Sequence, residues 1–233
     1  TKFASTVMST ERVGDMVTMA ARECFNGAYG PSYLEIPRDV LDREVDVTKA
    51  VLPQPGKYRA STKSIGDPAD IERLADILVN AERPAILFGQ QVWACRGHHE
   101  AVALLRGLDI PGYFNGAGRG FLPPGDPHHF DRTRSLAFDK ADVVVIVGTP
   151  FDFRMGYGKR IKVPTLVQID LGYNIVGKNR NVDLGIAGDP GAVCKAVLQA
   201  AGGRLKNDKR QARKEWMKTL SEAEDAALVK LMP

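Results

Sequence analysis

The chain has 233 residues, of which 44% are hydrophobic and 26% are charged. This composition is typical of a globular protein, and it excludes both a disordered chain and a fibrous one. The longest unbroken apolar run, Val143 to Val147, is far shorter than the roughly 20 residues of a membrane-spanning helix, and the N-terminus has no apolar signal stretch. We therefore expect a soluble, cytoplasmic protein with no membrane partner.

The net charge of +4 is concentrated in one segment near the C-terminus. Between Arg204 and Lys218 there are seven Lys or Arg residues and only two Asp or Glu, so the rest of the chain is close to neutral. Basic residues interleaved with aromatic ones, as nucleic-acid-binding surfaces require, occur nowhere else. We therefore expect a solvated basic helix and no nucleic-acid partner.

The first forty residues contain one helical and one extended pattern. Apolar residues at helical spacing predict a helix from Glu11 to Asn26, with Thr10 as its N-cap. A short strand from Tyr33 to Ile36 follows and is closed by Pro37. Because one helix and one strand cannot bury each other, we expect this region to be the last piece of a larger sheet. Residues 48–66, rich in Pro and Gly and without periodicity, are predicted to be a linker.

Strands and helices alternate through the middle of the chain. The sequence Asp67-Pro68 signals a helix start, and Asp189-Pro190 signals another. Strands are predicted at residues 85–88, 112–114, 143–147, 166–170 and 184–187, with further helices around 101–108 and 136–140. This alternation predicts an α/β fold with an open, doubly wound parallel sheet and helices on both faces.

Ligands of such sheets bind beyond the carboxyl ends of the strands. We therefore expect the residues that follow these strands to converge on one edge and to contact a cofactor. They are Gly89, Gln90, Asn115, Gly116, Gly118, Arg119, Gly120, Gly148, Thr149, Phe151, Asp152, Arg154 and Asp170.

Two of these loops have a composition suited to a nucleotide, although each has a purely structural alternative. The alternate glycines of residues 116–120 would let backbone amides approach a phosphate, but they lack the G-x-G-x-x-G spacing and could form only a sharp turn. Residues 148–158 offer Arg154 for a phosphate, or a surface loop in which Asp152 pairs with Arg154. Asp170 could bind ribose hydroxyls or simply end its strand.

No metal site and no catalytic residues are expected within these residues. Asp189 is expected to cap a helix rather than to bind a metal. The histidine pairs at 98–99 and 128–129 are adjacent in sequence, so their side chains do not share a helix face, and no third ligand is suitably placed. The three cysteines are too far apart in sequence for a Cys-x-x-Cys motif, which is typical of free thiols in a reducing compartment.

Several motifs, in the same order as in a known family, cover about residues 3–200. Residues 30–40, Gly-Pro-Ser-Tyr-Leu-Glu-Ile-Pro-Arg-Asp-Val, resemble the segment that closes the pyrimidine-binding domain of thiamine-diphosphate enzymes of the acetolactate synthase type. Other matches are residues 118–123 to G-K-G-x-x-P, 141–148 to A-D-x-V-x-x-x-G, 151–154 to F-D-D-R, 168–170 to the strand-end I-D, and 184–189 to V-x-G-D. Together they are far more specific than any one alone.

The resemblance implies a domain layout and an activity. Residues 1–47 would be the C-terminal piece of the pyrimidine-binding domain, 48–66 a linker, 67–202 the central domain, and 203–233 a basic helical connection toward the diphosphate-binding domain. The complete enzyme would decarboxylate a 2-oxo acid such as pyruvate and join the product to a second carbonyl, in branched-chain amino acid biosynthesis. It would form a homo-oligomer, a dimer or a tetramer.

The family also implies which cofactors to expect. Thiamine diphosphate and Mg²⁺ are held by a glutamate and a G-D-G…N motif in the other domains. Neither feature is among these residues, so the 233 residues alone are expected to be inactive. The central domain holds FAD in some members, ADP or CoA-related nucleotides in others, and nothing in several.

The alternatives to this interpretation stay open. Members that hold FAD read G-A-R-F-D-D-R, whereas this chain has Pro150 in place of the first arginine, which removes a donor. One alternative is a 2-hydroxyacyl-CoA or oxalyl-CoA lyase of the same superfamily. Others are a structural and assembly domain with an empty pocket, or a stand-alone nucleotide sensor.

Overall fold

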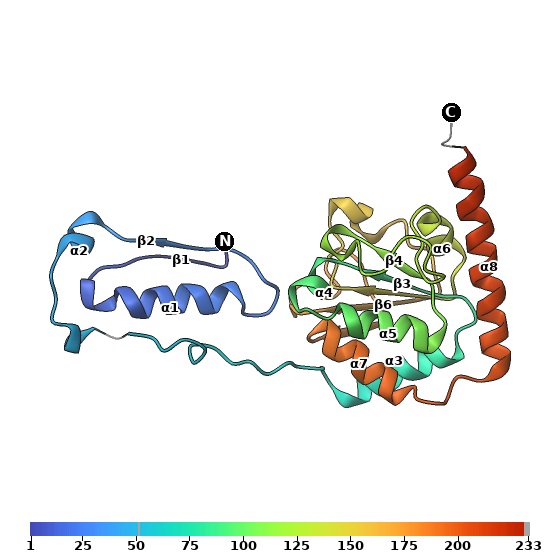
Figure 1. The fold of residues 1–233 in the computed structure, drawn as a ribbon, viewed down its shortest axis with the longest axis horizontal. Coiled ribbons are helices and arrows are strands. Elements are labelled where there is room, and N and C mark those ends of the chain that lie inside the picture. Colours follow the sequence, from blue (N-terminus) through green and yellow to red (C-terminus); the bar gives the residue numbers. More distant parts are fainter. Residues whose placement is uncertain (51, 231–233) are drawn as a thin grey trace. The chain divides into compact units, whose positions relative to one another are not determined.

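The computed structural model describes residues 1–50 and 52–230, and the chain divides into two compact units (Figure 1). Unit 1 comprises Thr1–Thr62, and unit 2 begins at Lys63. The boundary lies inside the segment predicted to be a linker. In the part of the chain that is described, we find no helix with both the length and the apolar character needed to cross a membrane.

Unit 1 is a small α/β element. Strand β1 (Phe3–Thr6) lies parallel to β2 (Ser32–Glu35), and α1 (Val13–Cys24) is the helix between them. Three short helical segments complete the unit: η1 (Thr10–Arg12), α2 (Arg38–Asp42) and η2 (Val47–Lys49). The predicted helix and strand are both present, each within a few residues of its expected bounds.

Two expectations for unit 1 were wrong. A single strand was expected, but β1 is also present; its four residues have one large apolar side chain and no usable periodicity. Thr10 was expected to cap the helix, yet its hydroxyl donates to the carbonyl of Val40 at 2.6 Å, and α1 begins only at Val13. The Thr10 hydroxyl, which was predicted to cap α1, therefore binds α2 instead.

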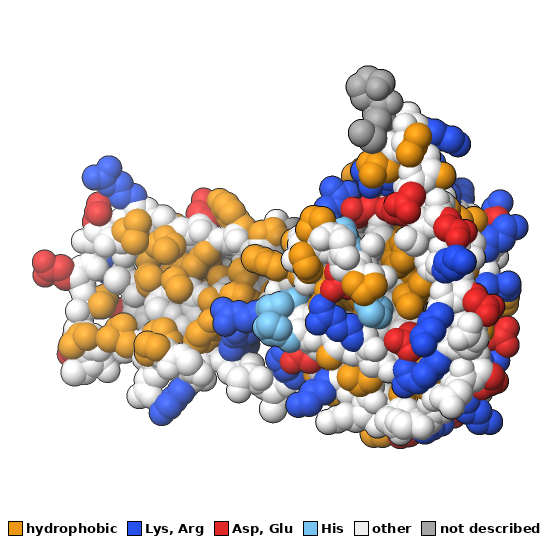
Figure 2. Space-filling view, turned by 45° about the vertical axis from the view of Figure 1, so that its right-hand side comes forward, with side chains coloured by type: hydrophobic (Ala, Val, Ile, Leu, Met, Phe, Trp, Pro, Cys, Tyr) orange, Lys and Arg blue, Asp and Glu red, His pale blue; other side chains and the backbone are white. Residues whose placement is uncertain are grey.

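Unit 1 leaves many apolar side chains in solvent, and orange surfaces are extensive there in Figure 2. No residue of α1 is fully buried. Met8, Tyr33 and Leu41 are 84%, 58% and 60% exposed. A two-stranded sheet of this kind is marginally stable by itself.

Unit 2 contains a five-stranded parallel sheet in the order β4-β3-β5-β6-β7. The strands are β3 (Pro84–Phe88), β4 (Gly112–Phe114), β5 (Val143–Val147), β6 (Thr165–Asp170) and β7 (Leu184–Ala187). All five predicted strands are confirmed. The order of strands reverses between β3 and β5, and such a switch point is the usual ligand-binding position of an open α/β sheet.

Helices cover both faces of this sheet, which confirms the doubly wound fold. One face packs against α3 (Pro68–Asn80), α5 (His98–Leu108) and α7 (Pro190–Ala200), and the other against α6 (Arg134–Lys140) and α8 (Asn207–Val229), while α4 (Gln90–Ala94) follows β3 directly. Both caps predicted from Asp-Pro sequences are confirmed. Asp67 accepts from the N–H of Ala69 at 2.8 Å, and Asp189 accepts from that of Ala192 at 2.9 Å.

The C-terminal helix α8 is not the solvated helix that its composition predicted. Trp216 and Leu220 are buried against the α6 face of the sheet. Most of its charge is locally balanced, and blue and red side chains are interspersed over this face in Figure 2. Lys209 pairs with Glu82 and Arg210 with Asp109, and Arg204, just before the helix, pairs with Glu72 and Asp76. The basic segment therefore complements acidic residues on and next to α3 and α5.

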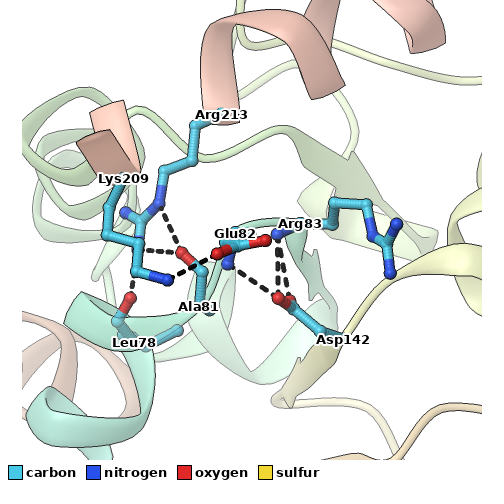
Figure 3. A network of polar contacts seen from close by, with 7 residues as sticks. All are labelled: Leu78, Ala81, Glu82, Arg83, Asp142, Lys209 and Arg213. Carbon is cyan, nitrogen blue, oxygen red and sulfur yellow. Dashed lines mark hydrogen bonds and ion pairs between the residues drawn. The ribbon is translucent and has the colours of Figure 1, made fainter. Parts of the chain in front are cut away.

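Arg213 of α8 is completely buried, and Figure 3 shows its contacts with Leu78 and Ala81. Its guanidinium donates to the carbonyls of Leu78, Ala81 and Leu108, which lie at the ends of α3 and α5. Carbonyls at helix C-termini lack partners within the helix and carry partial negative charge, so one cation satisfies two helix ends. Burial lowers the pKa of Arg213 to about 10, and the side chain stays protonated at neutral pH.

Candidate functional site

The loops after β3, β4 and β5 meet at one edge of the sheet, as expected. A β-carbon at Gly89 would overlap the hydroxyl of Thr149, and one at Gly148 would lie 2.7 Å from Cβ of Gln91. The turn η3 (Gly116–Gly118) packs on the same edge, because a β-carbon at Gly118 would lie 2.9 Å from the carbonyl oxygen of Phe88. Gly89, Gly118 and Gly148 therefore let the loops contact one another closely.

The predicted site residues differ in accessibility. Those exposed to solvent are Gln90, Gly116, Arg119, Gly120 and Arg154, and those half-buried are Asn115 and Asp152. The remaining ones, Gly89, Gly118, Gly148, Thr149, Phe151 and Asp170, are buried. The structure therefore brings the predicted loops together but exposes only part of the predicted set.

Two buried polar atoms at this edge lack hydrogen-bond partners among the described residues. They are Oγ1 of Thr149 and Oδ2 of Asp170, at the ends of the neighbouring strands β5 and β6. The other carboxylate oxygen of Asp170 accepts from the N–H of Gly172 at 3.1 Å, and burial raises the pKa of Asp170 to about 6. Asp170 thus closes its strand, and the side chain does not reach solvent.

Asp152 and Arg154 bind each other in the loop after β5. The guanidinium of Arg154 lies 2.6 Å from Oδ2 of Asp152, and the backbone N–H of Arg154 donates to Oδ1 of Asp152 at 2.9 Å. Hydrogen bonding by Arg154 lowers the pKa of Asp152. This is the surface-loop arrangement that the sequence left open, with Phe151 buried beneath it.

A cavity of about 460 Å³ opens beside β4, and we call it the β4 cavity. Two predicted residues, Arg119 and Gly120, line it together with Arg132, Arg134 and the aromatic ring of Phe114. Its volume lies within the usual range for small-molecule sites. Three guanidinium groups beside aromatic rings suit an anionic ligand that carries a ring system. Arg132 and Arg134 were not predicted, because neither follows a strand.

Glu224 of α8 holds one wall of the β4 cavity in place. Glu224 accepts from the backbone N–H groups of Asp131 at 2.9 Å, Arg132 at 2.8 Å and Thr133 at 2.9 Å. The hydroxyl of Thr133 also lies 3.0 Å from that of Tyr113, another lining residue. Glu224 was missed because its partners lie more than ninety residues away in the chain.

Residues 71–197 match the family described as "Thiamine pyrophosphate enzyme, central domain". An acetolactate synthase large subunit of Mycobacterium tuberculosis is 32% identical over 209 residues, covering 86% of this chain and 36% of that protein. A 2-hydroxyacyl-CoA lyase of Arabidopsis thaliana is 28% identical over 215 residues, covering 89% and 36%. The chain thus spans about a third of the length of these relatives.

A solved structure shares the fold. The benzoylformate decarboxylase of Polynucleobacter necessarius superposes with a TM-score of 0.71 at 17% identity, covering 89% of this chain and 40% of that one. The matched segment 71–197 contains β3 to β7 and the loops that line the β4 cavity. This chain therefore belongs to the thiamine pyrophosphate enzymes, and its parallel sheet is their central domain.

Proposed function

We propose that the chain is part of an acetolactate synthase-type enzyme, which decarboxylates a 2-oxo acid such as pyruvate and joins the product to a second carbonyl. The motif order and the relatives named acetolactate synthase support this assignment. Residues 1–47 would belong to the pyrimidine-binding domain, 48–66 to a linker, 67–202 to the central domain and 203–233 to the connection onward. The exposed apolar side chains of unit 1 would be covered if further strands of that domain lay beside it, which supports this layout.

The same proposal covers the assembly and the remaining cofactors. Thiamine diphosphate and Mg²⁺ would be bound by the other domains of a cytoplasmic homo-oligomer, a dimer or a tetramer. Bound thiamine diphosphate supplies the carbanion chemistry of the reaction, and the protein positions the reactants.

We infer that the central domain binds FAD or another ADP-containing nucleotide in the β4 cavity. The observation that carries this inference is the convergence of Arg119, Arg132 and Arg134 on one cavity at the carboxyl end of β4. Arg119 and Arg132 would bind the diphosphate. The backbone of Gly120, which lines the cavity with φ of 94°, could approach it without a side chain in the way. Members that hold FAD have an arginine where this chain has Pro150, so the residues present support binding of the ADP portion better than binding of the flavin.

Nucleotide binding is tested by titrating the protein with FAD and with ADP in a calorimeter. We expect both to bind, and Arg119→Ala to weaken binding about tenfold or more, because a charge-assisted contact to phosphate contributes roughly 1.5–3 kcal/mol. Arg83→Ala is the matched control, since Arg83 is exposed and remote from the β4 cavity lining. Equal affinity in all three proteins, or no binding of either nucleotide, would contradict the inference.

The reaction is tested with pyruvate. We expect the full-length enzyme to form acetolactate and the 233-residue chain to form none, because the activating glutamate and the G-D-G…N motif are not among its residues. Acetolactate production by the 233-residue chain would refute this expectation.

A second candidate function is that of a 2-hydroxyacyl-CoA lyase, which the Arabidopsis relative favours. CoA would then displace ADP from the β4 cavity, and a 2-hydroxyacyl-CoA rather than pyruvate would be consumed by the full-length enzyme. If neither nucleotide nor CoA binds, a structural and assembly role becomes the better assignment.

A further inference from the structure

A second cavity, of about 550 Å³, lies between α6 and the segment 153–162, and we call it the α6 cavity. It shares only Arg134 with the β4 cavity. Five of its lining side chains are cationic, and one, Asp139, is acidic. We propose that the α6 cavity binds a small organic polyanion, with two or more phosphate or comparable acidic groups and an apolar portion. This site does not depend on nucleotide binding in the β4 cavity.

Most of these cations lack a carboxylate partner. Arg154 pairs with Asp152, and Asp139 lies 3.4 Å from Lys140. The other four cations of the lining have no carboxylate within ion-pair distance among residues 1–50 and 52–230. They are Arg134, Lys159, Arg160 and Lys162. Elsewhere in unit 2, as along α8, many arginines and lysines do have acidic partners. Four unpaired like charges around one hollow repel one another, and a bound polyanion would remove that repulsion.

The walls of the α6 cavity are held in place by backbone contacts. The N–H of Lys162 donates to the carbonyl of Phe138 at 2.8 Å, which ties the basic segment to α6. Arg180 donates to the carbonyls of Gly158 at 3.3 Å and Ile161 at 2.9 Å. The backbone that carries these cations is therefore held in place, and little backbone ordering would be required on binding.

The rim of the cavity contains an unfavourable backbone conformation. Within η4 (Phe153–Gly158), Gly156 and Tyr157 both adopt left-handed values, with φ of 56° and 54°. This conformation is unfavourable for a tyrosine, and such strain is concentrated at ligand-binding loops. The bend brings the segment back over Arg160, whose Cγ would lie 3.8 Å from a β-carbon at Gly156.

The apolar part of the lining indicates what else the ligand carries. Phe153 is 74% exposed although it lines the cavity, and Leu136, Phe138 and Met155 lie along the same hollow. An exposed aromatic ring beside guanidinium groups is suited to stacking a planar group whose charges reach the cations. The volume admits a molecule of ordinary cofactor size.

The proposal is tested with two probes, inorganic triphosphate and a fluorescent naphthalene trisulfonate. We expect both to bind the protein, more weakly as salt is added. Lys159→Ala combined with Lys162→Ala should weaken both by about tenfold or more, because two of the unpaired cations are removed. Phe153→Ala should weaken only the naphthalene compound, since inorganic triphosphate has no ring.

The matched control is Lys195→Ala with Lys214→Ala, which removes the same net charge from exposed positions outside the cavity. We expect this variant to bind both probes like the unaltered protein. An equal loss in the two double variants would show only general charge attraction and would overturn the proposal, as would the absence of binding. Because the β4 cavity could also take up these anions, the two double variants are also compared in the Arg119→Ala background. The loss caused by Lys159→Ala with Lys162→Ala should persist there, so failure of nucleotide binding in the β4 cavity is distinguishable from failure here.

Discussion

Replacing Arg213 by methionine is expected to lower the melting temperature by about 6–12 °C. Methionine fills much of the volume but leaves the carbonyls of Leu78, Ala81 and Leu108 without their donor in a buried site. Each unsatisfied buried polar group costs roughly 1–3 kcal/mol, so we expect a loss of about 3 kcal/mol. For a domain of this size, each kcal/mol lost lowers the melting temperature by about 2–4 °C. Thermal unfolding followed by circular dichroism measures the effect.

Arg210→Met is the control for Arg213→Met. Arg210 is also on α8, but it is partly exposed and pairs with Asp109 at 2.6 Å, so its loss should cost less than about 1 kcal/mol. Arg213→Lys should recover part of the stability, because an ammonium group can reach one or two of the carbonyls. A melting temperature within about 1 °C of the unaltered protein for Arg213→Met would show that the buried guanidinium does not stabilise α8.

Replacing Glu224 by glutamine is expected to remove about 2–3 kcal/mol of stability at neutral pH. The carboxylate accepts from three backbone N–H groups and the hydroxyl of Thr133, whereas the amide nitrogen of glutamine faces two of these donors with its own hydrogens. Hydrogen bonds to charged groups contribute about 1.5–3 kcal/mol. Urea unfolding at neutral pH measures the loss.

The same residue makes stability depend on pH. Partial burial opposes ionisation of Glu224, but the N–H groups of Arg132, Asp131 and Thr133 outweigh it and hold its pKa below the ordinary value. A carboxyl with a lowered pKa in the folded state contributes stability above its unfolded pKa, and this is lost as the pH falls through the folded pKa. The difference between the unaltered protein and Glu224→Gln should therefore shrink below about pH 4.5.

Glu222→Gln is the control for Glu224→Gln. Glu222 is two residues away on the same helix but is exposed and faces only Lys218 at 3.8 Å. Its replacement should change stability by no more than about 0.5 kcal/mol at any pH. If the two variants behaved alike, the contact between α8 and the wall of the β4 cavity would not contribute to stability.

The five strands of unit 2 and two helix starts could be predicted because their signals are local. A fully buried parallel strand is a continuous apolar run, as in Val143–Val147. Asp67 and Asp189 act on N–H groups two or three residues further along the chain. The loops after the strands also converge as predicted, because all strands of a parallel sheet end at the same edge.

Other features depended on partners far apart in the chain. Arg213 binds carbonyls more than one hundred residues upstream. The prediction of a solvated helix, made from composition, was therefore wrong. The strand β1 has too few residues for a periodic pattern and exists by pairing with β2. Asp170 ends β6, and Thr149 and Gly89 follow strands as predicted, yet all three are buried.

The amino-acid order alone was therefore enough to establish the α/β class, the strands of the central sheet and the family. Folding in three dimensions determined which loop residues stay accessible, which arginines surround the two cavities, and that α8 packs on the domain through Arg213 and Glu224. The physical reason is the separation along the chain over which each effect acts. Propensity, capping and periodicity act over a few residues, whereas burial and ion pairing depend on side chains that only the folded chain brings together.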